Sequence, residues 1–387
     1  MNHRFLTGLA LAVAAFLAMA GIGFGQSASF ETTAGQAILI DGRSGLVLFE
    51  KNADTPIPPA SMSKLMTQIM VFDALKDGSL TLDQEFGVSE DAWKRGGSAS
   101  GGSTMYAEPN SKVKLSDLIQ GAIVQSANDA SIAIAENMAG NEAAFAQKMT
   151  AKARTLGLAS AEFRNATGLP DPEHRMSVRE LAILARYINL NFPEYYKYYS
   201  QPEFTWNKIT QKNRNPLLKD YPGADGMKTG YTKEAGYGLV GSAMRGNRRL
   251  IMVIAGLPSL KERKQEAQRL LDWGFSQFLA IDVYGRHERV GKATVWGGMQ
   301  RSVDLVTSEP FQISLSLREQ QAVEVKLYYS GPLLAPVKAG IKVGEIRFLV
   351  DGAAVASLPV ETAADVDAVQ SMWSKALDSV MIMTFGG

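Results

Sequence analysis

Strand-like sequence encloses a block of helical sequence in this 387-residue chain, and that order limits the fold more than any other feature. Residues 37–52, "AILIDGRSGLVLFEKN", are two apolar runs around a turn, which predicts a β-hairpin. A second hairpin is predicted from residue 237, where "GLVGSAM" and "RLIMVIAG" flank a Gly-Asn turn. We therefore expect an α+β or α/β domain in which strands from both ends of the segment share one sheet.

The residues between these hairpins have helical periodicity. After three prolines between positions 56 and 59, apolar residues recur at helical spacing from Met62 to Leu75, so Ser61 is predicted to open an amphipathic helix. Capping boxes, "SVRE" at 177–180 and "SLKE" at 259–262, predict two later helix starts. Further helices are predicted at 116–124, 128–138 and 142–157, with Gly157 in a C-terminal glycine position.

From about residue 280 the pattern changes to short apolar runs separated by Gly/Pro turns, among them "SVDLVTS", "FQISLSL" and "AVEVKLYYS". Several of these runs alternate strictly, which is typical of β-strands. Helices are expected to stop here. The sequence therefore predicts a first domain at 29–280 and a small all-β domain, a sandwich, at 281–362.

Both ends of the chain have patterns of their own. Residues 1–28 combine a basic start, an apolar run and small residues, which predicts a secretory signal cleaved after residue 20 or 28. The apolar run is shorter than the roughly 20 residues that a membrane span needs. Residues 363–387 return to helical spacing with Trp373 on the apolar side, which predicts an amphipathic helix lying on a membrane surface. Packing on the β-domain or dimerisation is the alternative for that helix.

Composition excludes several classes of function. The 40 basic and 39 acidic residues leave no charge excess for binding nucleic acid. The chain has no cysteine and only three histidines, so thiol chemistry is excluded and neither a metal site nor a cofactor is expected. Any nucleophile must therefore be activated by one of two widely separated histidines or, without the usual imidazole, by another group.

Such a group follows Ser61 in "PASMSKLMT", residues 59–67. Residues three apart on a helix share a side, so the amine of Lys64 can reach the hydroxyl of Ser61. The positive end of the helix dipole favours an alkoxide and lowers the pKa of the lysine. Taken alone, the same spacing also fits a serine cap followed by a solvent-facing lysine.

Two further motifs follow in order: Ser126-Ala127-Asn128 at a predicted helix junction, and Lys228-Thr229-Gly230 on a predicted strand. Ser-x-x-Lys, Ser-x-Asn and Lys-Thr-Gly together are the signature of penicillin-binding proteins and serine β-lactamases. From the signal to the terminal helix, the chain resembles the D-alanyl-D-alanine carboxypeptidases of the low-molecular-mass penicillin-binding proteins. The resemblance implies an α+β fold, with a helical block on an antiparallel sheet and a β-rich second domain.

The resemblance also implies roles for the motif residues. Ser61 would be acylated, Lys64 would take its proton, and Ser126 would return a proton to the departing D-alanine. Asn128 would hold the donor peptide's amide, which positions the substrate. The remaining predicted substrate-binding residues are Lys228 and Thr229 for the terminal carboxylate, Gly230 for close approach of the substrate backbone, Tyr231 as an oxyanion donor through its backbone N–H, together with that of Ser61, and Arg249 as a second cation.

Two residues keep alternative interpretations at this point. Arg249 could equally be a surface arginine at the end of a strand. His174 could belong to a catalytic triad, but a surface loop histidine is favoured because Lys64 already supplies a base.

The expected activity is removal of the terminal D-alanine from peptidoglycan stem pentapeptides in the periplasm, at the outer face of the inner membrane. A class A β-lactamase would need Glu-x-x-Leu-Asn, whereas Glu173 is followed by "HRMS", so penicillins are expected to inhibit. An endopeptidase that cuts cross-links and a non-catalytic wall-binding protein remain as alternatives. Expected partners are stem peptides, β-lactams and a membrane surface.

Overall fold

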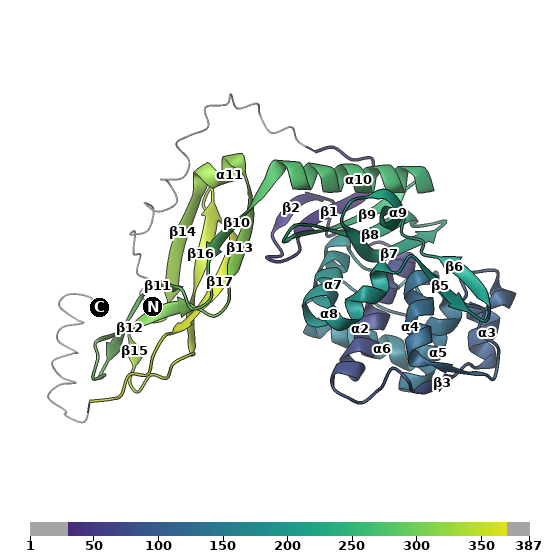
Figure 1. Cartoon of the computed structure of the whole chain (residues 1–387), viewed down its shortest axis with the longest axis horizontal. Helices are drawn as coiled ribbons and strands as arrows, with labels where there is room; N and C mark the ends of the chain where they lie inside the picture. The colour runs from purple at the N-terminus through teal and green to yellow at the C-terminus, as the bar shows by residue number, and fades with distance from the viewer. Residues whose placement is uncertain (1–29, 370–387) are drawn as a thin grey trace. The chain divides into compact units, whose positions relative to one another are not determined.

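The structure is a computed structural model that describes residues 30–369, and the chain divides into two compact units, Ser29–Ser276 and the residues from Gln277 onward (Figure 1). Each unit has its own sheets. The elements of the first unit are β1 (Gln36–Asp41), β2 (Val47–Lys51), η1 (Ala60–Ser63), α2 (Lys64–Lys76), β3 (Glu85–Gly87), α3 (Glu90–Gly96), η2 (Ser98–Ser100), β4 (Lys112–Lys114), α4 (Leu115–Val124), α5 (Asn128–Ala139), α6 (Glu142–Thr155), α7 (Val178–Asn191), α8 (Pro193–Tyr196), η3 (Lys197–Ser200), β5 (Glu203–Trp206), β6 (Ile209–Lys212), α9 (Leu217–Asp220), β7 (Ala224–Thr232), β8 (Gly236–Arg245), β9 (Arg248–Leu257) and α10 (Leu260–Gln277).

The main sheet of this unit is antiparallel, with the strand order β2-β1-β9-β8-β7. The first hairpin therefore pairs directly with the last strands, as the sequence predicts. Helix α7 packs against β9 and β1, and Figure 1 shows α10 on the opposite face of the sheet. Gly274 of α10 permits this approach, because a Cβ there would lie 2.4 Å from a methyl group of Leu39. Strand β7 is one edge of the sheet, and β2 is the other.

Helix α2 lies at the centre of the helical block. Its residues from Lys64 to Ile69 are all buried, as are Val71 and Phe72, so the first turns of the predicted amphipathic helix are buried on all sides. A helical segment in such surroundings needs no polar face. The predicted helices at 116–124 and 128–138 are confirmed as α4 and α5, and both later capping serines accept the expected N–H, from Glu180 and Glu262.

The second unit is a β-domain. Its elements are β10 (Phe278–Tyr284), β11 (Arg289–Trp296), β12 (Ser302–Thr307), β13 (Phe311–Ser316), α11 (Leu317–Ala322), β14 (Val323–Tyr329), β15 (Leu333–Leu334), β16 (Lys342–Val350) and β17 (Ala353–Thr362). Strands β10 and β13 form one sheet, and the other six strands form a second sheet. Phe348 of β16 stacks on Phe311 of β13 with ring centroids 4.9 Å apart, which packs the two sheets face to face.

Two expectations for this region need correction. Helices do not stop at residue 280, because α11 begins at Leu317 behind a capping box formed by Ser316 and Glu319. A helix does not begin at residue 363 or 364 either. Val366 forms an isolated β-bridge with Val337, and Ala368 forms one with Gly298. The rest of the predicted terminal helix lies outside the described residues, as does the predicted signal.

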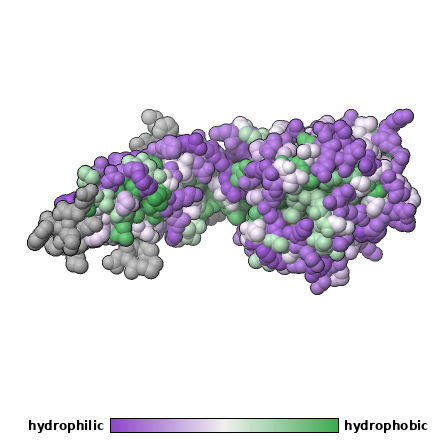
Figure 2. Space-filling model, turned by 90° about the horizontal axis from the view of Figure 1, so that it is seen from below, coloured by the Kyte–Doolittle hydropathy of each residue, from purple (hydrophilic) through white to green (hydrophobic). Residues whose placement is uncertain are grey.

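Within residues 30–369, no helix has both the length and the apolar content needed to cross a membrane. Figure 2 shows hydrophobic surface on part of the β-domain. The large apolar side chains exposed on this unit are Leu279, Met299, Leu317, Val325, Leu334 and Ile341.

Candidate active site

Ser61 lies in the 3-10 turn η1, one turn before α2 begins at Lys64. The prediction that Ser61 opens the helix is therefore wrong by one turn. Ala60 adopts a left-handed backbone conformation with φ 49°, and the N–H of Met62 bonds to the carbonyl of Pro59, so the chain enters α2 through a tighter turn. The spacing of three residues still brings Lys64 Nζ to 3.1 Å from Ser61 Oγ.

The amine of Lys64 is buried and has three oxygen neighbours. Besides the Ser61 hydroxyl, it donates to Asn128 Oδ1 at 2.7 Å and to the Thr167 carbonyl at 2.6 Å. The amide and carbonyl oxygens can only accept, whereas a hydroxyl can also donate. A neutral amine can therefore keep both its hydrogens on Asn128 and Thr167 and direct its lone pair at Ser61.

The electrostatics of the site favour that neutral form. Burial lowers the pKa of Lys64 from 10.5 to about 7, with a further contribution from the positive charge of Arg214. The carboxylates of Glu142 and Asp129 act in the opposite direction. The sequence suggested the helix dipole as the cause of a lowered lysine pKa, but burial is the main cause.

The Thr167 carbonyl is a contact that sequence reasoning missed. It lies 3.5 Å from Ser61 Oγ, within hydrogen-bonding range of the hydroxyl, as well as accepting from Lys64. Its loop is held by the side chain of Asn165, which accepts from the backbone N–H groups of Thr167 and Gly168. Gly168 has φ +75°, and a Cβ there would lie 2.0 Å from the Ala60 carbonyl oxygen. The "NATG" sequence was a usable signal, because asparagine and glycine favour such a turn.

Ser126 stands at the junction of α4 and α5, as predicted, with a positive φ of 61° and only 2% of its surface exposed. Among residues 30–369, its hydroxyl makes no hydrogen bond, so the structure does not join it to Lys64. Its neighbour Asn128 is held by a backbone bond to the Ser103 carbonyl at 2.7 Å. The Asn128 side chain, predicted to bind substrate, accepts a hydrogen bond from Lys64 through its Oδ1.

Strand β7 brings the third motif beside η1. A Cβ on Gly230 would lie 2.9 Å from the Pro59 carbonyl oxygen and 3.2 Å from the Ala60 Cβ, so only glycine allows this approach. Lys228 and Thr229 are buried, and Lys228 Nζ donates to the Thr229 carbonyl at 3.0 Å. Tyr231 is 53% exposed.

Arg249 is not part of this group, so its prediction needs correction. Its guanidinium forms a bidentate pair with Asp225, at 2.6 and 2.7 Å, and also donates to Tyr196 Oη and Ser242 Oγ. Lys228 of β7 pairs with Val240 of β8, which pairs with Val253 of β9. Arg249 lies four positions before Val253 on β9. That is about 13 Å along the strand, too far for one carboxylate to meet both. The partner carboxylate explains the position of Arg249.

Arg263, at the start of α10, is the cation that sequence reasoning missed. It is only 5% exposed, its Nε has no hydrogen-bond partner, and its guanidinium lies 5.6 Å from the centre of the Tyr237 ring. Burial lowers its pKa to about 10. Burial also lowers the pKa of Lys228 well below its usual value, with the charges of Lys64, Arg214 and Arg263 contributing. The site is therefore rich in buried cations and suited to an anion.

His174 is buried and lies outside the group around Ser61. Its surface is 2% exposed, its ring packs edge-on against Phe163, and burial lowers its pKa to about 4. The expected surface histidine is therefore a buried, neutral one. It makes no hydrogen bond to Ser61 or Lys64 in the part of the chain that the structure describes.

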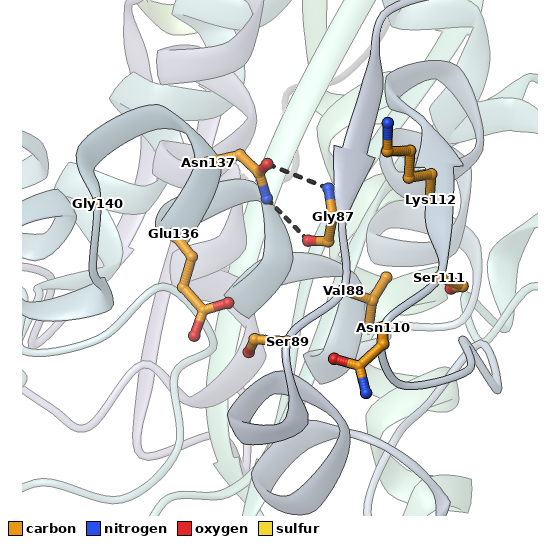
Figure 3. Close-up of a pocket in the computed structure, with 9 residues that line it drawn as sticks. All are labelled: Gly87, Val88, Ser89, Asn110, Ser111, Lys112, Glu136, Asn137 and Gly140. Carbon is orange, nitrogen blue, oxygen red and sulfur yellow. Dashed lines mark hydrogen bonds between the residues drawn. The ribbon is translucent and has the colours of Figure 1, made fainter.

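A surface hollow of about 510 Å³ lies elsewhere on this unit (Figure 3). Its lining includes Asn110, Lys112 and Glu136, and Asn137 bonds to both the N–H and the carbonyl of Gly87. No predicted site residue lines it.

The fold and these contacts are those of an active-serine enzyme with a lysine beside the nucleophile. Residues 23–259 match the family described as D-alanyl-D-alanine carboxypeptidase, and residues 278–368 match the domain described as penicillin-binding protein 5, C-terminal domain. The chain belongs to the D-alanyl-D-alanine carboxypeptidase family, as the motifs predicted.

Similar proteins support this assignment. The chain is 36% identical over 335 residues to D-alanyl-D-alanine carboxypeptidase DacF of Bacillus subtilis, covering 85% of each chain. It is 37% identical over 351 residues to DacD of Escherichia coli, covering 90% of each. Penicillin binding protein 5 from Haemophilus influenzae superimposes with a TM-score of 0.80 at 36% identity, covering 88% of this chain and 99% of that one.

Proposed function

We propose that this chain is a serine-type carboxypeptidase that removes the terminal D-alanine from peptidoglycan stem pentapeptides. The observation that carries the proposal is the amine of Lys64, buried, with a pKa of about 7, at 3.1 Å from Ser61 Oγ. A lysine in this condition can act as a base near neutral pH, which an ordinary lysine cannot.

Acylation begins when neutral Lys64 takes the Ser61 proton while Oγ forms a bond to the carbonyl carbon of the penultimate D-alanine. The carbonyl oxygen becomes an oxyanion, which the backbone N–H groups of Ser61 and Tyr231 stabilise. Asn128 and Thr167 keep their hold on the amine throughout, so the protonated lysine is also stabilised.

The C–N bond then breaks, and the departing D-alanine nitrogen needs a proton. Ser126 is assigned to this transfer because it precedes Asn128 at the helix junction and its hydroxyl has no competing partner among the described residues. Lys64 supplies the proton through Ser126 and returns to its neutral form. It then removes a proton from water, which attacks the ester carbonyl; the bond to Ser61 Oγ breaks, the shortened peptide leaves, and Lys64 returns the proton to Ser61 Oγ.

The terminal carboxylate of the substrate is assigned to Lys228, Thr229 and Arg263. Both cations are buried, and Arg263 lacks a hydrogen-bond partner at Nε. An incoming carboxylate provides the missing acceptor and offsets the cost of the buried charge. This requirement for a free carboxylate favours a carboxypeptidase.

The test uses the purified chain, a stem pentapeptide, a cross-linked stem dimer and a fluorescent penicillin. We expect release of D-alanine from the pentapeptide and a covalent penicillin adduct on Ser61, both lost in Ser61→Ala. Cleavage of the dimer with an intact pentapeptide would instead establish an endopeptidase. No adduct and no cleavage would leave a non-catalytic wall-binding protein.

We also propose that the enzyme is exported and held on the outer face of the inner membrane by residues after Val369. The support is the sequence pattern at both ends, together with exposed apolar side chains on the β-domain such as Met299 and Leu334. Removing residues 370–387 should move the enzyme from sedimenting membranes to the soluble fraction with its activity intact. Continued sedimentation of the shortened chain would rule out this anchor.

A further inference from the structure

Glu142 is a buried carboxylate that the proposed reaction does not use. It is the first residue of α6, and only 9% of its surface is exposed. Each of its two oxygens has a donor of its own. Oε1 accepts from the backbone N–H of Ala166 at 2.9 Å, and Oε2 pairs with Nη1 of Arg95 on α3 at 2.8 Å. The carboxylate therefore connects two helices of the block to the loop that carries Thr167.

The bond to Ala166 fixes a group that Lys64 uses. Ala166 directly precedes Thr167, whose carbonyl accepts from Lys64 Nζ at 2.6 Å. The carbonyl of Ala166 in turn accepts from the buried hydroxyl of Thr67 on α2 at 2.8 Å. The backbone at Ala166 is therefore held from α6 through its N–H and from α2 through its carbonyl. A loop released from α6 would no longer keep the next carbonyl aligned with the amine.

Charged groups from several elements also act on Lys64. Burial, the largest effect, and the charge of Arg214 lower its pKa, whereas Glu142 and Asp129 act to raise it. Asp129 accepts from the chain at residues 104–107, so Glu142 is the anion that also holds the Thr167 loop. The charged or titratable groups that act on Lys64, or on which its charge acts, are Asp129 of α5, Glu142 of α6, His174 before α7, Arg214 before α9 and Lys228 of β7.

We propose, resting on the function proposed above, that Glu142 is a positioning residue for the catalytic base. It holds the Thr167 carbonyl where the amine of Lys64 can donate to it, and it places a negative charge near that amine. Without this anion, burial and the positive charge of Arg214 would meet less opposition. The amine would then lose its proton at lower pH and would be a weaker base toward Ser61.

The experiment measures the second-order rate constant for acylation of the full chain by a fluorescent penicillin between pH 5 and pH 9. Glu142→Gln keeps the size of the side chain but removes its charge and leaves one oxygen for two donors. The inflection should fall by about 0.3 to 1 pH unit, so at pH 5 the rate, as a fraction of its plateau, should rise about 2- to 10-fold. The plateau itself should fall about 3- to 30-fold, because the loop is held less firmly.

A double variant, Arg95→Met with Glu142→Gln, separates the two effects. The single amide oxygen is then free to accept from the Ala166 N–H, so the plateau should recover toward the wild-type value. The inflection should stay lowered, because the anion beside the loop is still missing. Both members of the ion pair are removed together, so this variant also serves if Glu142→Gln alone does not fold.

Glu180→Gln is the matched control. Glu180 is another buried carboxylate in the first turn of a helix, α7, and it accepts from the backbone N–H groups of Ser160 and Ala161 at 2.8 and 2.9 Å. Its loss should lower the unfolding free energy but leave the inflection of the acylation rate at the wild-type pH. A purely structural role for Glu142 would give the same result.

An inflection at the wild-type pH in both Glu142 variants would therefore overturn the positioning proposal and leave the carboxypeptidase in place. A plateau that stays as low in the double variant as in Glu142→Gln would likewise overturn the role of the Ala166 bond. A wild type that forms no penicillin adduct and releases no D-alanine would remove the proposed function itself.

Discussion

The rate of acylation at Ser61 should follow the protonation of Lys64, with an inflection near pH 7. At pH 7 a lysine with the usual pKa of 10.5 is neutral in about one molecule in 3,000, whereas a pKa of about 7 makes about half neutral. Burial therefore raises the fraction of usable base about 1,500-fold, equivalent to about 4 kcal/mol. The amine also becomes a weaker base, so the net gain in rate is smaller.

The assay is the second-order rate constant for acylation by a fluorescent penicillin between pH 5 and pH 9. Because the charged form is inactive, the rate should fall about tenfold per pH unit well below pH 7 and level off above it. Arg214→Met removes a positive charge that lowers the pKa of Lys64, so its inflection should move to higher pH. Lys76→Met makes the same charge change about 18 Å away along α2 and should leave the inflection in place. A rate independent of pH between 5 and 8 would refute the assignment of Lys64 as the base.

Three further predictions concern stability and substrate binding. Between about pH 7 and pH 10 the unfolded chain binds the Lys64 proton and the folded chain does not. The unfolding free energy of the wild type, measured relative to Lys64→Met in denaturant titrations, should therefore rise with pH over this range. A fall would contradict the buried, neutral amine. Gly168→Ala should lower the unfolding free energy by more than about 1 kcal/mol and slow acylation about 100-fold. The reason is that its Cβ would collide with the Ala60 carbonyl beside Ser61. Wild-type values would mean that the loop can shift freely. Asp225→Asn should lower the unfolding free energy by about 2 kcal/mol, because the partly buried pair with Arg249 is lost, and should keep kcat/KM. Arg263→Gln should instead lower kcat/KM for D-alanine release about 10- to 100-fold. The reverse pattern would assign Arg249 to the site.

Local signals in the sequence were sufficient for most of the fold. The hairpins at 37–52 and 237–256 and the start of α7 follow from turn residues, alternation and a capping box, all of which act over a few residues. The burial of α2 could not be predicted in the same way. Whether a helix packs on one side or on every side depends on what surrounds it, and a pattern within the helix does not record its neighbours.

In the site too, contacts within one turn could be predicted and contacts between distant segments could not. The spacing of Ser61 and Lys64, together with the two later motifs, was enough to predict their contact, because that contact is set within one turn. The Thr167 carbonyl is a backbone group more than 100 residues away, and although "NATG" indicates a turn there, nothing in that motif indicates that the turn meets Lys64. Arg249 and Arg263 are both arginines near strand β9. They are distinguished by Asp225, which pairs with Arg249, and by the Nε of Arg263, which has no hydrogen-bond partner.

The two buried lysines explain why recognition of a carboxylate and activation of a serine belong to one site. Lys64 helps to lower the pKa of Lys228, so the charge on either amine disfavours charge on the other. A substrate carboxylate at Lys228 and Arg263 favours the proton on Lys228, because an anion stabilises the adjacent cation. Charge held there opposes a second charge on Lys64, whose acceptors Asn128 and Thr167 are already satisfied by a neutral amine. The charge states of Lys64 and Lys228 are therefore linked, and the bound carboxylate acts on both amines.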